Sequence, residues 1–227
     1  MYGDANFINQ VPLFSGLDEA QQASLQQKMG QTTLRRGETL FEEGDLGDRL
    51  YIVTEGKVKL GHTSNDGRES LLAVLGPGEI LGELTLFDPG PRSTTATAVS
   101  PATLLHLLHS DLMEIVEANP TLAKHMLRAL AQRLRRTNES LSDLVFSDVP
   151  GRLAKALLDL ADRFGRPATD GVLVAHELTQ EELAQLVGAS RETVNKALAE
   201  FVSRGWIRLE ARAVVILDLP RLRQRSR

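Results

Sequence analysis

The chain has 227 residues, 42% of them hydrophobic and 25% charged, with a net charge of −4, a composition that suits a globular protein of two modest domains. The absence of cysteine excludes disulfides, thiolate zinc sites and cysteine-held iron–sulfur clusters, so any signal must be sensed by other chemistry. No apolar run approaches the ~18 residues of a membrane helix, and the N-terminus lacks the pattern of a secretory signal, which predicts a cytoplasmic protein.

The first part of the sequence is rich in turn residues. Residues 6–29 predict a short helix that Ser15 or Asp18 caps at its N-terminus. Between Gly30 and Gly90 lie 11 of the 18 glycines, which separate short apolar runs such as LYIVT and SLLAVL as in an antiparallel β-barrel. The triplet NDG at 65–67 predicts a hairpin between two of these runs. We therefore expect the first domain to be a β-barrel.

Within this barrel sequence, an acid and an arginine stand on either side of the turn FDPGP. Gly82-Glu83-Leu84 precedes the turn and Arg92-Ser93 follows it. Arginine neutralises a phosphate with paired donors, glycine exposes backbone N–H groups, and a carboxylate accepts from a ribose hydroxyl. These residues could therefore hold a phosphorylated sugar. The alternative is that Glu83 and Arg92 merely form a salt bridge across a hairpin.

A long helix is predicted next. Asn119-Pro120, a cap followed by proline at the first helical position, opens a stretch that runs without proline or glycine to Val149. Pro150-Gly151 then breaks the chain before a new apolar pattern, which predicts a hinge over Asp148–Gly151.

One face of this helix predicts self-association. Mostly apolar residues recur along it at alternating steps of four and three, which is the a/d seam of a two-stranded coiled coil. The seam comprises Leu127, Ala131, Leu134, Asn138, Leu141 and Val145. The polar Asn138, beside Thr137, either fixes the register and partner number of the seam or contacts a ligand.

The segment Leu178–Glu210 indicates a winged helix-turn-helix. Thr179 and Glu182 form a capping box that starts a helix at Gln180. Gly188 can take the left-handed conformation that ends this helix, and Ser190 can cap the next one. The pattern from Trp206 to Leu219 then predicts a hairpin.

The second of these helices has a buried stripe and a polar face. The predicted stripe comprises Val194, Ala197, Leu198 and Phe201, and the opposite face carries Arg191, Glu192, Asn195, Lys196 and Ala199. Arginine and lysine can donate to guanine and a carboxylate can accept from cytosine, so this face could read G·C pairs in a major groove. The alternative is a charged, solvated surface. The charge distribution supports DNA binding. Residues 1–149 carry a net charge of −7, whereas residues 150–227, which contain the helix-turn-helix, carry a net charge of +3 that would attract the phosphate backbone.

Three stretches, GELTLFDPGPRSTTA, RRTNESLSDLVFSDVPGR and VGASRETVNKAL, resemble the cyclic-AMP receptor protein regulators, in particular the GlxR-type regulators of actinobacteria. The resemblance covers nearly the whole chain. It implies an α+β protein with an N-terminal cyclic-nucleotide-binding β-barrel of the jelly-roll kind at 1–118, a dimerisation helix and hinge at 119–149, and a C-terminal winged helix-turn-helix at 150–227. It further implies a cytoplasmic homodimer that binds cyclic AMP as allosteric ligand, palindromic promoter DNA with TGTGA-type half-sites, and RNA polymerase.

The same resemblance implies roles for single residues. Glu83 would bind the ribose 2′-hydroxyl, and Gly82, Arg92 and Ser93 the cyclic phosphate, with Leu84 beside them. Thr137 and Asn138 of the partner subunit would bind the adenine. The residues expected to contact DNA bases are Arg191, Glu192 and Lys196, and those expected near the DNA backbone are Thr179, Gln180, Ser190 and Thr193.

Two other classes of function compete with this regulator. A nucleoid-associated protein that bends DNA without a ligand would also need the basic C-terminal part. An enzyme, or the regulatory subunit of one, is disfavoured because two such domains leave no room for a catalytic one. His106 and His109 are the only close histidine pair, with His62, His125 and His176 elsewhere, so we expect no metal site.

Overall fold

The computed structural model describes residues 11, 14, 17–64, 67, 69–88 and 90–226. The chain divides into two units, Met1–Leu60 with Val74–Thr137 and Gly61–Ala73 with Asn138–Arg227. The domain bounds predicted from the sequence, 1–118, 119–149 and 150–227, stay a prediction. Within the part of the chain that the structure describes, no helix is long and apolar enough to cross a membrane.

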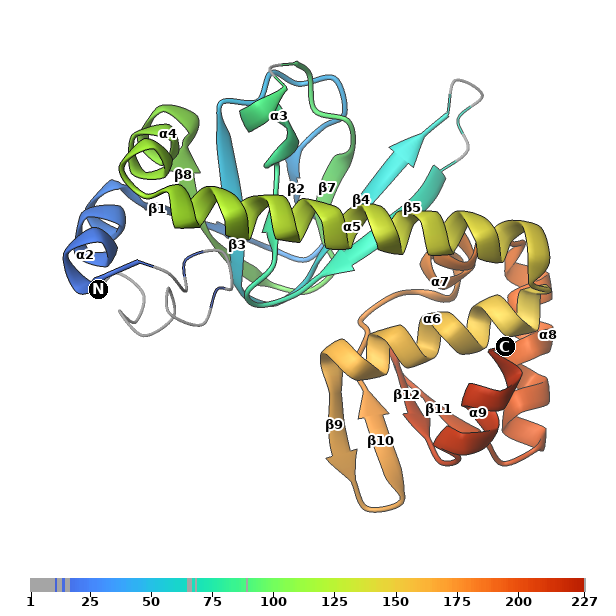
Figure 1. The fold of residues 1–227 in the computed structure, drawn as a ribbon. Helices are drawn as coiled ribbons and strands as arrows, with labels where there is room; N and C mark the ends of the chain where they lie inside the picture. Colours follow the sequence, from blue (N-terminus) through green and yellow to red (C-terminus); the bar gives the residue numbers. More distant parts are fainter. Residues whose placement is uncertain are drawn as a thin grey trace. The chain divides into compact units, whose positions relative to one another are not determined.

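Two four-stranded sheets form the N-terminal part, with strand orders β1-β8-β3-β6 and β2-β7-β4-β5 (Figure 1). Their strands are β1 (Gly30–Leu34), β2 (Thr39–Phe41), β3 (Arg49–Glu55), β4 (Val58–Thr63), β5 (Glu69–Leu75), β6 (Ile80–Leu81), β7 (Thr95–Ala98) and β8 (Ala102–Leu108). The central strand β8 pairs antiparallel with both β1 and β3. On β3, Leu50 and Ile52 are fully buried, because alternate side chains of a strand point to the same face. The predicted N-terminal β-domain is confirmed.

Helices cover one side of this part. They are α2 (Glu19–Lys28), α3 (Leu84–Phe87), α4 (His109–Ala118) and the start of α5 (Pro120–Phe146). Helix α2 begins at Asp18, whose carboxylate accepts from the backbone N–H of Gln21 at 2.8 Å; Ser15, the alternative cap, lies outside the described residues. Leu25 of α2 and Leu112 of α4 are fully buried in one cluster with Leu107 of β8, so the sheet and helices share a core. Asn65 and Asp66 of the predicted hairpin are also outside the described residues, but β4 and β5 are neighbours in their sheet.

The long helix ends earlier than the sequence predicts. Helix α5 stops at Phe146, and α6 (Val149–Phe164) begins after a break of two residues. Asp148 caps α6 by accepting from the backbone N–H of Gly151 at 2.9 Å. Pro150 therefore lies in the first turn of α6, where its missing N–H costs nothing. The expectation that α5 runs to Val149 and breaks at Pro150-Gly151 was wrong because it overlooked Asp148 as a cap.

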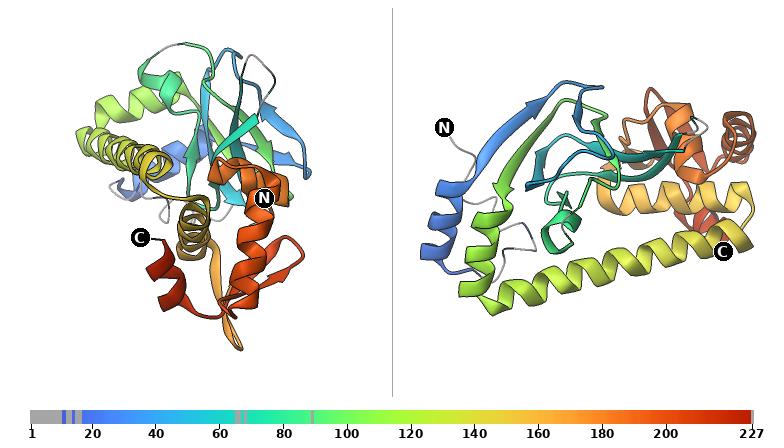
Figure 2. Two further views of the ribbon diagram at one scale, coloured as in Figure 1. Left: turned by 90° about the vertical axis from the view of Figure 1, so that its right-hand side faces the viewer. Right: turned by 90° about the horizontal axis from the view of Figure 1, so that it is seen from above.

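The C-terminal part combines helices with a four-stranded sheet of order β11-β12-β10-β9. Its elements after α6 are β9 (Gly165–Ala168), β10 (Gly171–Val174), α7 (Gln180–Val187), α8 (Arg191–Ser203), β11 (Ile207–Glu210), β12 (Ala213–Ile216) and α9 (Leu219–Arg225). Helix α6 packs against α7, α8 and α9 (Figures 1 and 2). The basic C-terminal segment is ordered as α9, because Leu222 is fully buried and the Arg225 guanidinium donates to the Asp148 carboxylate at 2.5 Å.

Candidate functional site

The turn between β6 and β7 is folded tightly around its glycine and arginine. Gly82 has a φ of +80°, a left-handed conformation that favours glycine. The backbone of Arg92 is hydrogen-bonded to the loop before β3. Its N–H donates to the backbone carbonyl of Asp45 at 2.7 Å, and its carbonyl accepts from the backbone N–H of Gly44 at 2.8 Å. The backbone of Arg92 is thus held in place by the loop before β3.

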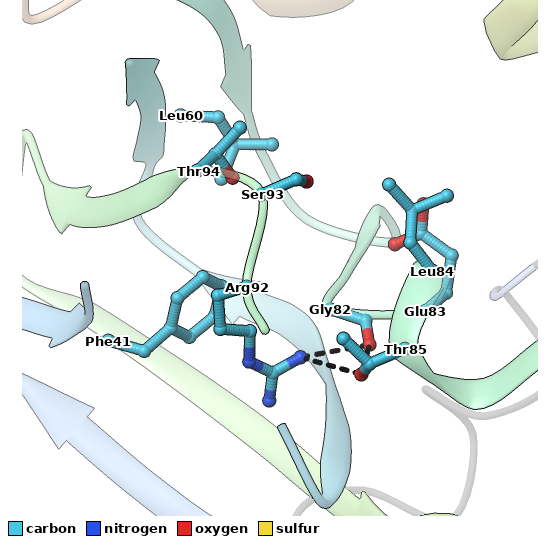
Figure 3. Close-up of a pocket in the computed structure, with 9 residues that line it drawn as sticks. All are labelled: Phe41, Leu60, Gly82, Glu83, Leu84, Thr85, Arg92, Ser93 and Thr94. Atoms are coloured by element: carbon cyan, nitrogen blue, oxygen red, sulfur yellow. Dashed lines mark hydrogen bonds between the residues drawn. The ribbon is translucent and has the colours of Figure 1, made fainter. Parts of the chain in front are cut away.

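The side chain of Arg92 is the centre of the site, and only 4% of it is exposed. Its Nη1 donates to the Gly82 carbonyl at 3.0 Å and to Thr85 Oγ1 at 3.3 Å, and its Nη2 donates to the Arg49 carbonyl at 2.7 Å (Figure 3). The guanidinium also lies over the ring of Phe41. The acceptors of these hydrogen bonds are two backbone carbonyls and a hydroxyl, and not the Glu83 carboxylate. Arg92 is therefore not held by the salt bridge to Glu83 that the sequence left open as an alternative.

Burial of this cation favours an anion beside it. Burial lowers the pKa of Arg92 from its ordinary value, against the opposing effects of Tyr51, Asp48 and Glu83. The buried Nε has no hydrogen-bond partner among the described residues. A buried donor without a partner destabilises the fold, and a phosphate oxygen is a strong acceptor for a guanidinium. The positive charge of Arg92 and its unpaired Nε donor therefore both fit a phosphate group as ligand.

A pocket adjoins this arginine, with about 290 Å³ of space of which part is open solvent. It is lined by Phe41, Leu60, Gly82, Glu83, Leu84, Thr85, Arg92, Ser93 and Thr94 (Figure 3). The structure therefore brings together the five residues that the sequence predicted in the barrel. Sequence reasoning missed the other four: Thr85 could have been found three residues after Gly82, but Phe41, Leu60 and Thr94 come from strands or loops with no local signal.

The two predicted adenine contacts lie elsewhere on the chain. Thr137 and Asn138 are exposed on α5 and are not among the residues that line the pocket. Their assignment to the partner subunit's ligand remains a prediction. The other residues of the predicted seam are exposed as well: Leu127 by 65%, Leu134 by 62%, Leu141 by 58% and Val145 by 73%. Such an exposed apolar row on one helix favours an interface.

The helix-turn-helix has the local geometry that its sequence predicts. Thr179 Oγ1 accepts from the Glu182 N–H at 3.1 Å and the Glu182 carboxylate accepts from the Thr179 N–H at 2.8 Å, which completes the capping box. Gly188 has a φ of +67° and ends α7. Ser190 then caps α8 by accepting from the Thr193 N–H at 3.2 Å. The predicted starts of both helices, Gln180 and Arg191, are confirmed.

Helix α8 buries one face and exposes the other. Val194 and Phe201 are fully buried, with Ala197 and Leu198 nearly so, while Arg191, Glu192, Lys196 and Ala199 are exposed. Lys196 Nζ lies 2.7 Å from Glu192 Oε1. Asn195 differs from the expectation, because it is partly buried and its buried Oδ1 accepts no hydrogen bond from the residues that the structure describes. The face available to DNA is thus narrower than the sequence suggests.

A further arginine, not predicted from the sequence, fixes the turn between α7 and α8. Arg152 Nε donates to the Val187 carbonyl at 2.9 Å and Nη2 to the Gly188 carbonyl at 3.2 Å. Its Nη1 donates to the Ser147 carbonyl at 2.7 Å. Charged donors to carbonyls make stronger hydrogen bonds than neutral ones, so the turn is held firmly to the chain between α5 and α6.

The hairpin predicted between Trp206 and Leu219 is confirmed as β11 and β12, which pair antiparallel. Arg208 on β11 bonds to Asp170 in the turn between β9 and β10. The second hairpin, β9 and β10, completes the sheet beside the helix-turn-helix.

Comparisons with known proteins match a domain family to each of the two parts of the chain. Residues 31–119 match the cyclic nucleotide-binding domain, and residues 151–225 match the Crp-like helix-turn-helix domain. A CRP-like cAMP-activated global transcriptional regulator of Mycobacterium tuberculosis is 50% identical over 215 residues, which cover 95% of this chain and 96% of that protein. The Cyclic AMP receptor protein of Thermus thermophilus is 36% identical over 212 residues, covering 91% and 95%.

Solved structures show the same architecture. The c-di-GMP-responsive global regulator CLP of Xanthomonas campestris matches with a TM-score of 0.75 and 25% identity, covering 88% of this chain and 99% of that one. The activity of such proteins is transcription regulation and not enzymatic catalysis. With its two matched domains and a relative that is half identical along nearly its whole length, the chain belongs to the cyclic-AMP receptor protein family of transcription regulators, of the GlxR type.

Proposed function

We propose that this protein is a cyclic-AMP-responsive, sequence-specific transcription regulator that binds palindromic promoter sites as a homodimer. The observation that carries the proposal is Arg92, a buried cation with one open donor in the lining of a pocket. Its relatives from M. tuberculosis and T. thermophilus are described as cAMP-activated and as a cyclic AMP receptor. Because it acts on chromosomal DNA and RNA polymerase, its place is the cytoplasm.

The roles of the pocket residues follow from their chemistry. Arg92 would neutralise the cyclic phosphate, with Gly82 and Ser93 offering further donors. The Glu83 carboxylate would accept from the ribose 2′-hydroxyl, and Leu84, 43% exposed, would pack beside the ligand. Thr137 and Asn138 of the partner subunit would bind the adenine, which would couple the ligand to the dimer.

The roles of the DNA-binding residues are proposals of the same kind. Arg191, Glu192 and Lys196 would reach base edges from α8. Thr179 and Gln180 at the start of α7, with Ser190 and Thr193 at the start of α8, would lie near the phosphates, where helix N-termini favour anions. Two such helices in a dimer would read half-sites about one DNA turn apart.

The decisive experiment is a titration of a labelled palindrome with TGTGA-type half-sites, followed by fluorescence anisotropy. We expect cyclic AMP to tighten DNA binding, whereas cyclic GMP and cyclic di-GMP leave it unchanged. The last control is included because the structural relative from X. campestris is described as c-di-GMP-responsive. Tight binding that no nucleotide alters would contradict ligand control and leave the DNA-reading assignment in place.

A matched pair of variants tests the phosphate assignment. Arg92→Ala should abolish cyclic AMP binding in calorimetry while circular dichroism and light scattering still report a folded dimer. Arg35→Ala removes one positive charge from an exposed site on the same domain and should bind as the wild type does. Retained tight binding by Arg92→Ala would show that the phosphate lies elsewhere.

The second candidate is a DNA-bending protein that ignores nucleotides, for which the positive C-terminal part, +3 over residues 150–227, is the supporting observation. It predicts equal affinity for the palindrome and for a scrambled duplex, with a steep dependence on salt. A sequence preference that cyclic AMP increases would exclude it.

A further inference from the structure

Behind the pocket, the hydroxyl of Thr85 connects Arg92 to a histidine. Thr85 is 5% exposed. Its Oγ1 lies 3.2 Å from the Gly82 carbonyl, 3.3 Å from Arg92 Nη1 and 3.4 Å from His109 Nε2. The three neighbours belong to different segments, so a single side chain joins the turn after β6, the segment that leads into β7 and the start of α4.

Part of the hydrogen bonding in this network is fixed by chemistry. Arg92 can only donate, and the Gly82 carbonyl can only accept. The Thr85 oxygen therefore accepts from Arg92, and the Thr85 hydroxyl donates either to the Gly82 carbonyl or, when Nε2 of the neutral ring carries no hydrogen, to His109 Nε2. In the protonated ring Nε2 is a donor, so its hydrogen goes to the Thr85 oxygen or to the Gly82 carbonyl.

The charges that face His109 come from several elements. The charged groups that act on its ring are Arg92 and Asp48, which lies directly before β3. Asp48 is itself paired with Arg49 through two hydrogen bonds of 2.7 and 2.8 Å. The backbone N–H of His109 donates to the backbone carbonyl of Asp48 at 2.9 Å, which fixes the start of α4. On α4 itself, Asp111 is paired with Lys28 of α2, and His106 of β8 contacts Thr32 and Tyr51 instead.

We propose that His109 is a positioning residue for the anion-binding Arg92, that it acts through Thr85, and that binding of the cyclic phosphate is coupled to protonation of His109. This inference rests on the proposed function of the pocket. It assigns to the site a proton as a second ligand, taken up at His109.

The direction of the coupling follows from the charges. Burial, and then the positive charge of Arg92, lowers the pKa of His109 from 6.5, while Asp48 and the Gly82 carbonyl oppose this. A bound phosphate offsets the charge of Arg92 and so raises the pKa of His109 relative to the ligand-free protein. Because the complex holds the proton more tightly, the nucleotide must bind more tightly as the pH falls.

The test is calorimetry of cyclic AMP on the full chain from about pH 8 to about pH 5.5, the range in which histidine titrates. The wild type should gain roughly three- to tenfold in affinity over this range, because the complex holds the proton more tightly than the free protein does. Titrations at one pH in buffers of different ionisation enthalpy should show proton uptake on binding. The cyclic phosphate itself does not titrate there.

Four variants separate positioning from packing. His109→Gln keeps a donor for Thr85 but cannot titrate, so both the pH dependence and the proton uptake should disappear. His106→Gln removes the neighbouring histidine, which does not contact Thr85, and should retain both. Thr85→Val should weaken cyclic AMP binding and lose the pH dependence, whereas Thr85→Ser, which keeps the hydroxyl, should restore both.

The outcomes distinguish this inference from the function on which it rests. Cyclic AMP binding that is equally tight at every pH, or a pH dependence that persists in His109→Gln, would overturn the inference while leaving the nucleotide site intact. Absence of cyclic AMP binding in the wild type at every pH would overturn the proposed function, and the inference with it.

Discussion

The Arg92 guanidinium lies over the ring of Phe41, with Cζ 4.4 Å from the ring centroid. The aromatic ring stabilises the buried cation through its negative face, and such a contact contributes up to about 2 kcal/mol when it is shielded from water. We expect Phe41→Leu to weaken cyclic AMP binding by up to about 2 kcal/mol, because the guanidinium is no longer held in one orientation. Phe41→Tyr, which keeps a ring, is the control in calorimetry. Equal affinities of the two variants would mean that the ring only fills space.

Gly82 offers a test that separates backbone strain from a steric clash. A Cβ at Gly82 would lie 2.4 Å from Arg92 Nη1, whereas a Cβ at Gly78 would meet nothing within 4 Å, although both glycines have positive φ, +80° and +85°. Both alanine variants should lose roughly 1–2 kcal/mol of unfolding free energy from the left-handed backbone. Only Gly82→Ala should also lose cyclic AMP binding, as measured by calorimetry. Normal binding by Gly82→Ala would show that Arg92 can move without loss of function.

The exposed face of α8 predicts how base recognition responds to mutation. Arg191→Ala should relax preference at one base pair of each half-site by about 1–3 kcal/mol, because a bidentate contact to guanine would be lost. The measurement is competition between the palindrome and its single-base variants. A uniform loss of affinity across all these sequences would instead identify Arg191 as a phosphate contact.

The two histidines beside the pocket predict a loss of stability in mild acid. Burial is the main cause that lowers the pKa of His106 and of His109 from 6.5. Below that pH the unfolded chain binds more protons than the folded one, so the unfolding free energy should decrease as the pH falls below about 6.5. The carboxylates of Asp48 and Asp148, whose pKa is lowered from 3.8 chiefly by hydrogen bonds from Arg49 and Arg225, should lose their contribution only in stronger acid.

Urea denaturation at three pH values checks this prediction. In His106→Gln the unfolding free energy should depend less steeply on pH than in the wild type. A stability that is constant from about pH 7.5 to about pH 5.5, where histidines titrate, would contradict it. Cyclic AMP should reduce this decrease of the unfolding free energy, since ligand binding stabilises the folded state by mass action.

Local signals in the sequence were sufficient for the helix-turn-helix. The capping box of Thr179 and Glu182, the left-handed Gly188 and the buried stripe that ends at Phe201 each depend on neighbours within a few residues. The same holds for Asp18 at the start of α2. Such features can be predicted because the atoms that satisfy one another lie close along the chain.

The surroundings of Arg92 could not be predicted in this way. The Arg49 carbonyl, the ring of Phe41 and the loop at Gly44 and Asp45 reach it from distant parts of the sequence, and no periodicity brings them together. The break after Phe146 was misplaced for a different reason: proline and glycine were read as helix breakers, although a cap at Asp148 lets both lie inside the next helix. The partly buried Asn195 likewise depends on packing that a helical pattern does not contain.

Arg152 fixes the turn of the helix-turn-helix to the chain at the end of α5. Because one guanidinium holds the carbonyls of Val187 and Gly188 together with that of Ser147, the turn before α8 cannot shift relative to the chain at the end of α5 without breaking a charged hydrogen bond. A change of direction at the break would therefore have to release the Ser147 carbonyl from Arg152 before α6 and α8 could turn together.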